Sequence, residues 1–233
     1  KSPLVGLFVY NEEMTFHVVT LFPEVFDAYL KESVIGRAIK KGHLKVKFYD
    51  IRSFSKDKKH NKIDDKAYGG GPGMVLEVGP IVGAIEKAVK GKRNAKIILF
   101  TTVGRQFDNK YAKELTKYKD IVLVAGRYEG VDERIKKVFK VEEVSVGPYV
   151  LTGGEIPAMA VIDAVSRQIK GVLGKAESLE EERYGVGVPV YTRPEVFKYK
   201  GKSYKVPKAL ISGNHKEIES WRLKNQKRTR VAK

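Results

Sequence analysis

The stretch Ile121-Val-Leu-Val-Ala-Gly-Arg-Tyr-Glu-Gly130 joins an apolar, largely β-branched run directly to a glycine-bearing loop. A short apolar run of this kind, followed by loop residues, indicates a buried strand. Glycine permits positive φ and lets the backbone approach a ligand closely. In α/β proteins, ligands bind at loops that leave the carboxyl ends of parallel strands. The stretch therefore predicts a parallel sheet with a ligand site at one edge.

Two further segments repeat this clustering of glycine. Tyr68-Gly-Gly-Gly-Pro-Gly-Met74 comes earlier in the chain, and Val146-Gly-Pro-Tyr-Val-Leu-Thr-Gly-Gly-Glu155 comes later, directly after another apolar run. Pro72 and Pro148 stiffen these loops because proline fixes φ. We call residues 68–74, 126–134 and 146–155 the first, second and third glycine segments. Together they predict an enzyme that holds a small molecule largely with backbone groups.

Apolar runs typical of strands alternate with stretches of helical periodicity. The expected strands cover 16–22, 44–48, 96–100, 121–125 and 141–146, and the expected helices cover 23–41, 80–90, 108–118, 131–139 and 156–169. Residues 52–67 are polar and charged, which predicts a long loop. Strands alternating with helices indicate an α/β fold with a mostly parallel sheet.

The composition restricts the class of protein. The 233-residue chain has a formal net charge of +17 and a pI near 9.7. Such a charge favours a polyanionic partner, most simply nucleic acid. The absence of cysteine excludes disulfides and thiolate metal sites. Since the sequence shows neither a membrane-length apolar run nor a signal peptide, we expect no membrane association and a cytoplasmic location.

The character of the sequence changes after residue 174, which predicts two domains. Residues 1–13 read as an N-terminal extension, 14–174 as the ligand-binding domain, 175–193 as an acidic linker and 194–233 as a small, mainly helical domain. From Lys198 onward this last piece carries twelve Lys or Arg against two Glu. Asn214 with Glu217 resembles a capping box that opens a final helix. The concentrated positive charge predicts contact with RNA.

Several common motifs are absent. The chain has no P-loop, no G-x-G-x-x-G after its first strand and no G-x-S-x-G nucleophile elbow. Its four histidines are scattered without the spacing of metal ligands, so we expect no metal site. These absences argue against an NTPase, a dehydrogenase and a hydrolase.

The glycine segments and three later motifs together resemble one family. The later motifs are Asp163-Ala-Val-Ser-Arg167, Tyr191-Thr-Arg-Pro-Glu195 and Ser212-Gly-Asn-His215. All occur in the order found in the bacterial tRNA (guanine-N(1)-)-methyltransferases of the SPOUT superfamily. The resemblance runs from about residue 15 to residue 230, and so covers nearly the whole chain.

This resemblance implies a fold and a cofactor that periodicity does not reveal. In the family, the C-terminal part of the α/β sheet domain is tied in a deep trefoil knot. S-adenosylmethionine, the methyl donor, binds there in a bent form. Thr102 stands where the family usually has a proline on the adenine side. The implied cofactor-binding residues are Thr102, Gly126, Tyr128, Glu129, Gly130, Val146, Gly147, Pro148, Tyr149, Val150, Leu151, Gly153 and Gly154.

The resemblance also implies the substrate and the assembly. Family members act on the guanosine immediately 3′ of the anticodon and form homodimers with active sites at the interface. Their C-terminal domain helps to hold the anticodon stem-loop of tRNA. Mg²⁺ helps the family's activity, but no ligand cluster for it is legible in this sequence. The implied substrate-binding residues are Tyr68, Gly71, Gly73, His60, Ser212, Asn214 and His215.

The chemistry calls for a base and a cation. Guanine N1 carries a proton that a carboxylate can remove, and the charge that develops on the guanine oxygen favours an arginine. In the family, these roles belong to an Asp in the linker and an Arg that ends the preceding helix. The Arg matches Arg167, and the Asp position falls on Glu182, with Glu181 as a near alternative.

Two other functions stay open at this point. One is a SPOUT methyltransferase that acts on ribosomal RNA or a ribose hydroxyl, and the other is a non-catalytic RNA-binding protein with a decayed pocket. A carboxylate in the linker favours methylation of a base over methylation of a ribose hydroxyl, because ribose methylation can use other groups. Binding of S-adenosylmethionine would exclude a non-catalytic RNA-binding protein with a decayed pocket.

Overall fold

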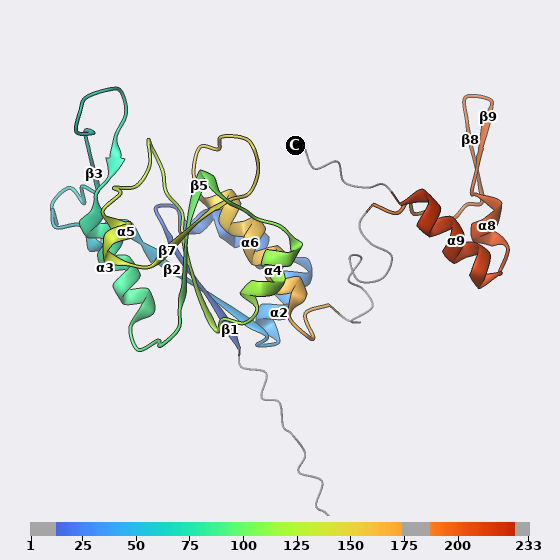
Figure 1. The fold of residues 1–233 in the computed structure, drawn as a ribbon, viewed down its shortest axis with the longest axis horizontal. Helices are drawn as coiled ribbons and strands as arrows, with labels where there is room; N and C mark the ends of the chain where they lie inside the picture. The colour runs from blue at the N-terminus through green and yellow to red at the C-terminus, as the bar shows by residue number, and fades with distance from the viewer. Residues whose placement is uncertain (1–12, 174–186, 227–233) are drawn as a thin grey trace, which may run out of the picture. The chain divides into compact units, whose positions relative to one another are not determined.

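The computed structural model describes residues 13–173 and 187–226, which belong to two compact units that meet in the chain at Leu173 and Gly174 (Figure 1). Residues 1–12, 174–186 and 227–233, which include most of the expected linker, lie outside the described residues.

The first unit is built on a five-stranded, entirely parallel sheet with the strand order β2-β1-β6-β5-β7. This confirms the α/β fold with a mostly parallel sheet. Four strands match the expected apolar runs closely, and the fifth, β5, is longer. The strands are β1 (Met14–Thr20), β2 (Leu44–Asp50), β5 (Lys96–Gln106), β6 (Asp120–Val124) and β7 (Val141–Ser145). The trefoil knot implied by the resemblance stays a prediction.

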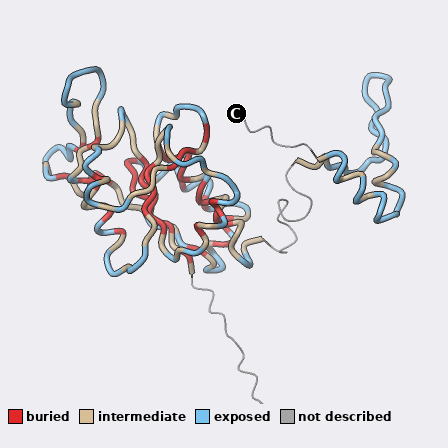
Figure 2. The backbone as a smooth tube through the Cα atoms, viewed as in Figure 1, coloured by how far each residue is buried: buried red, intermediate tan, exposed pale blue. Residues whose placement is uncertain are grey.

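Both faces of this sheet are covered, which explains why its strands are continuously apolar. In β6, Ile121 and Leu123 belong to one core cluster, whereas Val122 and Val124 belong to the other. Successive strand side chains alternate between faces, so each face needs its own apolar cover. Figure 2 shows the buried residues concentrated along the strands of this unit.

Helices supply that cover. One face packs against α1 (Asp27–Leu30), α2 (Ser33–Lys40), α4 (Asn109–Leu115) and α6 (Glu155–Gln168). The other face packs against α3 (Val78–Val89) and α5 (Ile135–Val138), together with the 3-10 helix η2 (Ile51–Phe54). A short antiparallel pair, β3 (Asp64–Asp65) and β4 (Val75–Leu76), interrupts the expected loop and brackets the first glycine segment.

The expected helix over 23–41 is wrong as a continuous element. The chain forms the 3-10 helix η1 (Pro23–Phe26), then α1, and then α2 after a break at Lys31 and Glu32. The buried stripe runs through Phe26 and Leu30 but continues at Ile35. This spacing skips one residue relative to a single helix, so the chain must turn between the two parts. Ser33 accommodates the turn with φ of 51°.

The second unit combines a hairpin with two helices. Strands β8 (Val196–Tyr199) and β9 (Lys202–Lys205) pair antiparallel, and α8 (Lys208–Ile211) and α9 (His215–Asn225) follow. The expectation of a mainly helical domain thus missed the hairpin. The expected cap is present, because the Asn214 side chain accepts a hydrogen bond from the Lys216 N–H at 3.1 Å. None of residues 187–226 is buried, as the absence of red in Figure 2 shows.

Candidate functional site

A cavity of about 480 Å³ lies where β5, β6 and β7 end, at the edge that the opening stretch of sequence predicts. Cofactor and small-molecule sites commonly have volumes of roughly 300–1,000 Å³. The walls come from the end of β5 and from the second and third glycine segments. The lining residues are Leu99 to Val103, Gly126 to Val131, Glu133, Glu143 to Gly147, Tyr149 to Gly154 and Pro157.

The structure brings the residues implied for the cofactor together at this cavity. All of them line it except Pro148, which is exposed beyond the rim. Tyr149 folds back against Gly147, where a Cβ would lie 2.3 Å from the tyrosine ring. The Ser145 hydroxyl donates to the Gly147 carbonyl at 3.0 Å and fixes the start of this loop. Any larger residue at Gly147 would therefore displace Tyr149.

Two glycine segments interlock at the floor of the cavity. The Gly154 N–H donates to the Gly126 carbonyl at 2.9 Å. A Cβ on Gly154 would lie 2.5 Å from Cα of Ala125. Because the neighbouring atoms are backbone, no rotamer change can relieve this contact. Glycine is thus required at position 154 for close approach between loops, and not for positive φ, since its φ is −84°.

Sequence analysis missed a buried polar cluster beneath these loops. The Glu155 side chain is 3% exposed and accepts a hydrogen bond from the Thr20 hydroxyl at 2.9 Å. Arg127 Nε lies 3.0 Å from the other Glu155 oxygen, although its N–H is not aimed well enough for a hydrogen bond. Arg127 also donates to the Thr152 carbonyl at 3.3 Å and lies over the Phe22 ring at 4.7 Å. Arg127 therefore ties the second glycine segment to the third.

A bulge in β5 forms another wall. The pairing of β5 with β7 shifts between Phe100 and Arg105, and both of these residues align with Val144. Gly104 makes the bulge possible, since a Cβ there would lie 2.4 Å from the backbone of Glu143 and Val144. The bulge carries the residues at positions 101–103 out of the ladder and onto the cavity rim. Thr102 reaches the cavity in this way.

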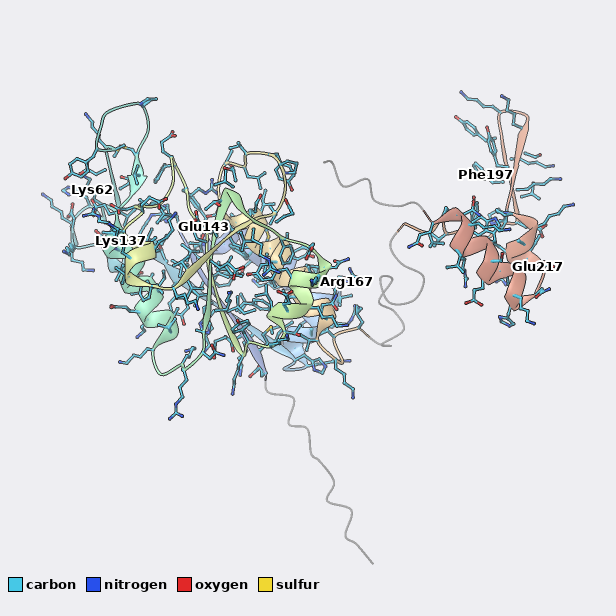
Figure 3. The ribbon with its side chains drawn as sticks, in the orientation of Figure 1. Lys62, Lys137, Glu143, Arg167, Phe197 and Glu217 are labelled. Atoms are coloured by element: carbon cyan, nitrogen blue, oxygen red, sulfur yellow. The ribbon has the colours of Figure 1, made fainter. Side chains whose placement is uncertain are left out.

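The cavity is acidic although the chain is strongly basic. Its charged lining residues are Glu129, Glu133 and Glu143, against the single cation Arg127. Lys136 lies 2.5 Å from Glu133 and 3.0 Å from Glu143, and these carboxylates raise the pKa of its ammonium, Glu133 first. Glu143 belongs to β7, and Figure 3 labels it among the strands of the sheet. This lining suits a ligand that carries positive charge and hydroxyl groups.

The first glycine segment borders the same cavity. The Glu129 N–H donates to the Met74 carbonyl at 3.0 Å, and a Cβ on Gly73 would lie 2.5 Å from the Glu129 side chain. Gly71 has φ of 109°, and no atom lies within 4 Å of the place where its Cβ would be. Tyr68 is fully exposed. The segment thus presents an open, exposed loop beside the rim.

Tyr128 links these loops to a neighbouring strand. Its φ is 60°, a left-handed conformation that is uncommon for a bulky residue. Burial and a hydrogen bond with Asp64 both raise the pKa of its hydroxyl, burial being the larger cause. Strain of this kind is concentrated at functional sites in proteins.

Arg167 and His60 do not line the cavity. Arg167, which is labelled in Figure 3, is in the last turn of α6, whose first turn carries Glu155. The two positions are separated by roughly 18 Å along the helix axis, at about 1.5 Å per residue. His60 is exposed and lies 3.1 Å from an Asp57 carboxylate oxygen. Glu182 and Glu181 lie outside the described residues.

Three substrate candidates belong to the second unit. Ser212 and Asn214 form the turn before α9, where the Asn214 N–H donates to the Ser212 hydroxyl at 3.1 Å. His215 begins the helix. Within the described ranges 13–173 and 187–226, no group of three or more His, Asp or Glu side chains could hold a metal ion. No helix among the same residues is long and apolar enough to cross a bilayer.

Comparison with known proteins places the chain in one family. The model of the family "tRNA (Guanine-1)-methyltransferase TrmD" matches residues 14–233. A tRNA (guanine-N(1)-)-methyltransferase from Citrifermentans bemidjiense is 48% identical over 94% of this chain and 87% of its own length. The relative of the same name from Clostridioides difficile is 44% identical over 90% of both chains.

A solved structure shares the fold. The crystal structure of tRNA (m1G37) methyltransferase from Aquifex aeolicus has a TM-score of 0.74 and 41% sequence identity, covering 91% of this chain and 88% of that one. The SPOUT-type α/β fold expected from the resemblance is thereby confirmed. Sequence and fold agree, and the chain belongs to the tRNA (guanine-1)-methyltransferase family TrmD.

Proposed function

We propose that this protein transfers a methyl group from S-adenosylmethionine to N1 of the guanosine immediately 3′ of the anticodon in tRNA. One observation carries the proposal: in a chain of this family, all but one of the residues implied for the cofactor come together on the walls of a single cavity of about 480 Å³.

The lining fits S-adenosylmethionine, which is a sulfonium with an ammonium, a carboxylate, a ribose and an adenine. Three glutamates offer acceptors to its positive charge and to the ribose hydroxyls. Thr101 Oγ1 is buried and has no hydrogen-bond partner among the described residues, so it is available to a ligand. The loop backbones at Gly126 and Val146 to Leu151 offer further donors and acceptors. When bound, the cofactor supplies an electrophilic methyl group.

A linker carboxylate and an arginine complete the reaction. Glu182, or its neighbour Glu181, would take the N1 proton. The electron pair left on N1 would bond to the methyl carbon while the carbon–sulfur bond breaks, its electron pair going to sulfur, which leaves as a neutral thioether. Arg167 stabilises the negative charge that develops on the guanine carbonyl oxygen. Aligned proton transfer of this kind contributes about 10²- to 10⁴-fold to the rate.

The position of Arg167 supports a dimer. Glu155 is buried beneath the cavity, and Arg167 is at the other end of the same helix, roughly 18 Å away at about 1.5 Å per residue. Arg167 does not line the cavity of its own chain. A homodimer that brings Arg167 of one protomer to the cavity of its partner resolves this separation. We therefore propose that each active site is shared between two copies of the chain.

The two units divide the work in this proposal. Residues 14–174 bind the cofactor, and residues 194–233 hold the anticodon stem-loop through their concentrated positive charge. Neutralisation of phosphates by Lys and Arg releases counterions, so affinity for tRNA falls steeply with salt. Since its substrate would be tRNA, the enzyme is expected to act in the cytoplasm.

Nucleoside analysis tests the proposal. Unmodified tRNA is incubated with the full chain and isotopically labelled S-adenosylmethionine. One portion is then digested to nucleosides to identify the product, another to oligonucleotides to locate it, and both are examined by mass spectrometry. The expected product is labelled 1-methylguanosine at the position 3′ of the anticodon. A label on ribose, or on ribosomal RNA alone, would identify a different SPOUT methyltransferase. Cofactor binding with no transfer to any RNA would overturn the enzymatic assignment.

A further inference from the structure

The hairpin of the second unit is short, regular and tightly turned. Its two-residue turn, Lys200-Gly201, has φ of 47° and 74°, and two positive values in succession are the signature of a type I′ turn. This turn fixes the register. Val196 pairs with Lys205, Phe197 with Tyr204, Lys198 with Ser203 and Tyr199 with Lys202.

The register gathers the aromatic residues on one side of the ribbon. Residues directly opposite each other in an antiparallel pair share a face, as do residues two apart in one strand. Phe197, Tyr199 and Tyr204 therefore lie on one face, which we call the aromatic face. The Phe197 ring lies 6.4 Å from the Tyr199 ring at an interplanar angle of 9°, and 6.5 Å from the Tyr204 ring at 38°.

Within residues 187–226, this face is left uncovered. Phe197 is 56% exposed, and Tyr199 and Tyr204 are each 54% exposed. Figure 3 shows the labelled Phe197 on the hairpin, which extends away from α8 and α9. Large exposed apolar groups that adjoin one another usually mark an interaction site, because burying them would be favourable. A lone two-stranded hairpin is also marginal in water, so a partner would stabilise it.

The charges around the aromatic face select the partner. Residues 196–205 contain four lysines and no acidic residue. Lys202 is opposite Tyr199 and shares the aromatic face, Lys200 lies in the turn, and the other two lysines are on the opposite face. The Lys200 ammonium lies 5.4 Å from the centre of the Tyr199 ring. Exposed aromatic rings interleaved with cations are what proteins use to bind unpaired nucleotides: bases stack on the rings, and lysines contact phosphates.

We propose that the β8–β9 hairpin is a binding site for unpaired nucleotides of RNA, which stack on Phe197, Tyr199 and Tyr204. This site lies in the unit without the cofactor cavity and adds stacking to the charge contacts proposed for that unit. That the RNA is tRNA rests on the proposed function. Unpaired nucleotides are required because bases within a duplex keep their faces covered by neighbouring bases.

A binding titration with the full chain tests the site. The probes are a fluorescent, unstructured RNA of about ten nucleotides, within the usual site size of one such module, and the duplex with its complement. Tyr199→Ala should weaken single-strand binding by about 5- to 150-fold, the effect of losing one stacked base. Tyr199→Phe keeps the ring and should bind nearly as the wild type does. Phe197→Ala should behave like Tyr199→Ala.

Salt dependence separates stacking from charge. Tyr199→Ala should leave the slope of log affinity against log salt unchanged, whereas Lys202→Ala, opposite Tyr199 on the same face, should reduce it by about 0.7, the value for one phosphate contact on a single strand. Circular dichroism and sedimentation of each variant establish that fold and assembly are retained. If Tyr199→Ala disturbs the hairpin, the same comparison is made at position 197. There, Phe197→Tyr keeps an aromatic ring and Phe197→Ala removes it.

Each outcome bears on the proposal. Unchanged single-strand affinity in both alanine variants would overturn it, as would an equal loss of duplex binding. Loss of self-association in place of RNA binding would assign the aromatic face to a second copy of the chain and would also overturn it. If the wild type methylates tRNA while the alanine variants bind RNA normally, the hairpin proposal is overturned and the proposed function stands. If the rings bind RNA but no methylguanosine forms, the proposed function fails and the hairpin site stands.

Discussion

Replacement of Gly154 by alanine tests whether the glycine segments are required for close backbone approach. The native φ of −84° and ψ of 0° suit alanine, so the backbone conformation itself adds no cost. The added Cβ would lie 2.5 Å from Cα of Ala125 and 3.0 Å from N of Gly126. The third glycine segment must therefore move away from the second, which also weakens the 2.9 Å hydrogen bond from Gly154 N–H to the Gly126 carbonyl.

The magnitude follows from those two losses. Overpacking in a well-packed region costs about 1–3 kcal/mol, and the hydrogen bond contributes about 0.5–1.5 kcal/mol. We expect Gly154→Ala to lower the free energy of unfolding by about 2–4 kcal/mol, a fall in Tm of roughly 5–15 °C for a unit of this size. Affinity for S-adenosylmethionine should fall as well, because the displaced segment forms a wall of the cavity.

Gly79→Ala provides the matched control. Gly79 lies in the first turn of α3, and no atom beyond its chain neighbours lies within 4 Å of the place where its Cβ would be. Alanine there restricts the unfolded chain but precedes Pro80, which disfavours a helical conformation, so we expect the stability to change by no more than about 1 kcal/mol. Thermal unfolding and calorimetric titration of the cofactor measure both effects. If Gly154→Ala matches the wild type in Tm and in affinity, close approach does not explain this glycine.

Three further predictions concern catalysis, the buried cluster and pH. Glu182→Gln should bind tRNA and cofactor but reduce kcat by about 10²-fold or more, and mixing it with Arg167→Ala should restore part of the activity if sites are shared between subunits. Arg127→Ala should destabilise the fold by about 3 kcal/mol in denaturant titrations, because it removes the cation beside the buried Glu155 carboxylate. Burial lowers the pKa of His17 from 6.5, so its stabilising contribution should be complete above pH 6.5 and decline as pH falls through the folded-state pKa, by up to about 1.4 kcal/mol per pH unit.

Each of these has its control. If Glu181→Gln is inactive and Glu182→Gln is active, the base is the neighbouring residue; full activity of both rules out a carboxylate base at either position. If Arg127→Ala is as stable as the wild type, solvent stabilises the Glu155 carboxylate in place of Arg127. For the pH effect, His60→Gln should keep the acid-dependent loss and His17→Gln should diminish it, since only His17 is fully buried. Equal loss in both variants would assign the effect to other groups.

Local features of the sequence were enough to predict the frame of the first unit. Apolar runs such as Ile121-Val-Leu-Val-Ala125 predicted strands because both faces of the sheet are covered, so neither face needs polar residues. Glycine clusters predicted the cavity at the ends of those strands, since close approach and positive φ are properties of single residues. The family resemblance then identified about half of the residues that line the cavity, and all but one of the residues that it implied lie there.

Other features arose only from tertiary structure. The Thr20 hydroxyl and the Glu155 carboxylate are separated by 135 residues, and no periodicity relates them to each other or to Arg127. The β5 bulge depends on Gly104 meeting the backbone of a different strand. The break between α1 and α2 arises because the core buries Ile35 and not Val34. These choices depend on contacts between distant parts of the chain.

The second unit shows the same division. The sequence alone determined its charge and the cap at Asn214, because composition and capping are local. Only the folded hairpin decided that Phe197, Tyr199 and Tyr204 share one face, since the positive φ at Lys200 and Gly201 set the register between strands. A shift of one residue would place opposing side chains on different faces. Sequence determines which chemical groups are present, and long-range pairing determines which of them meet.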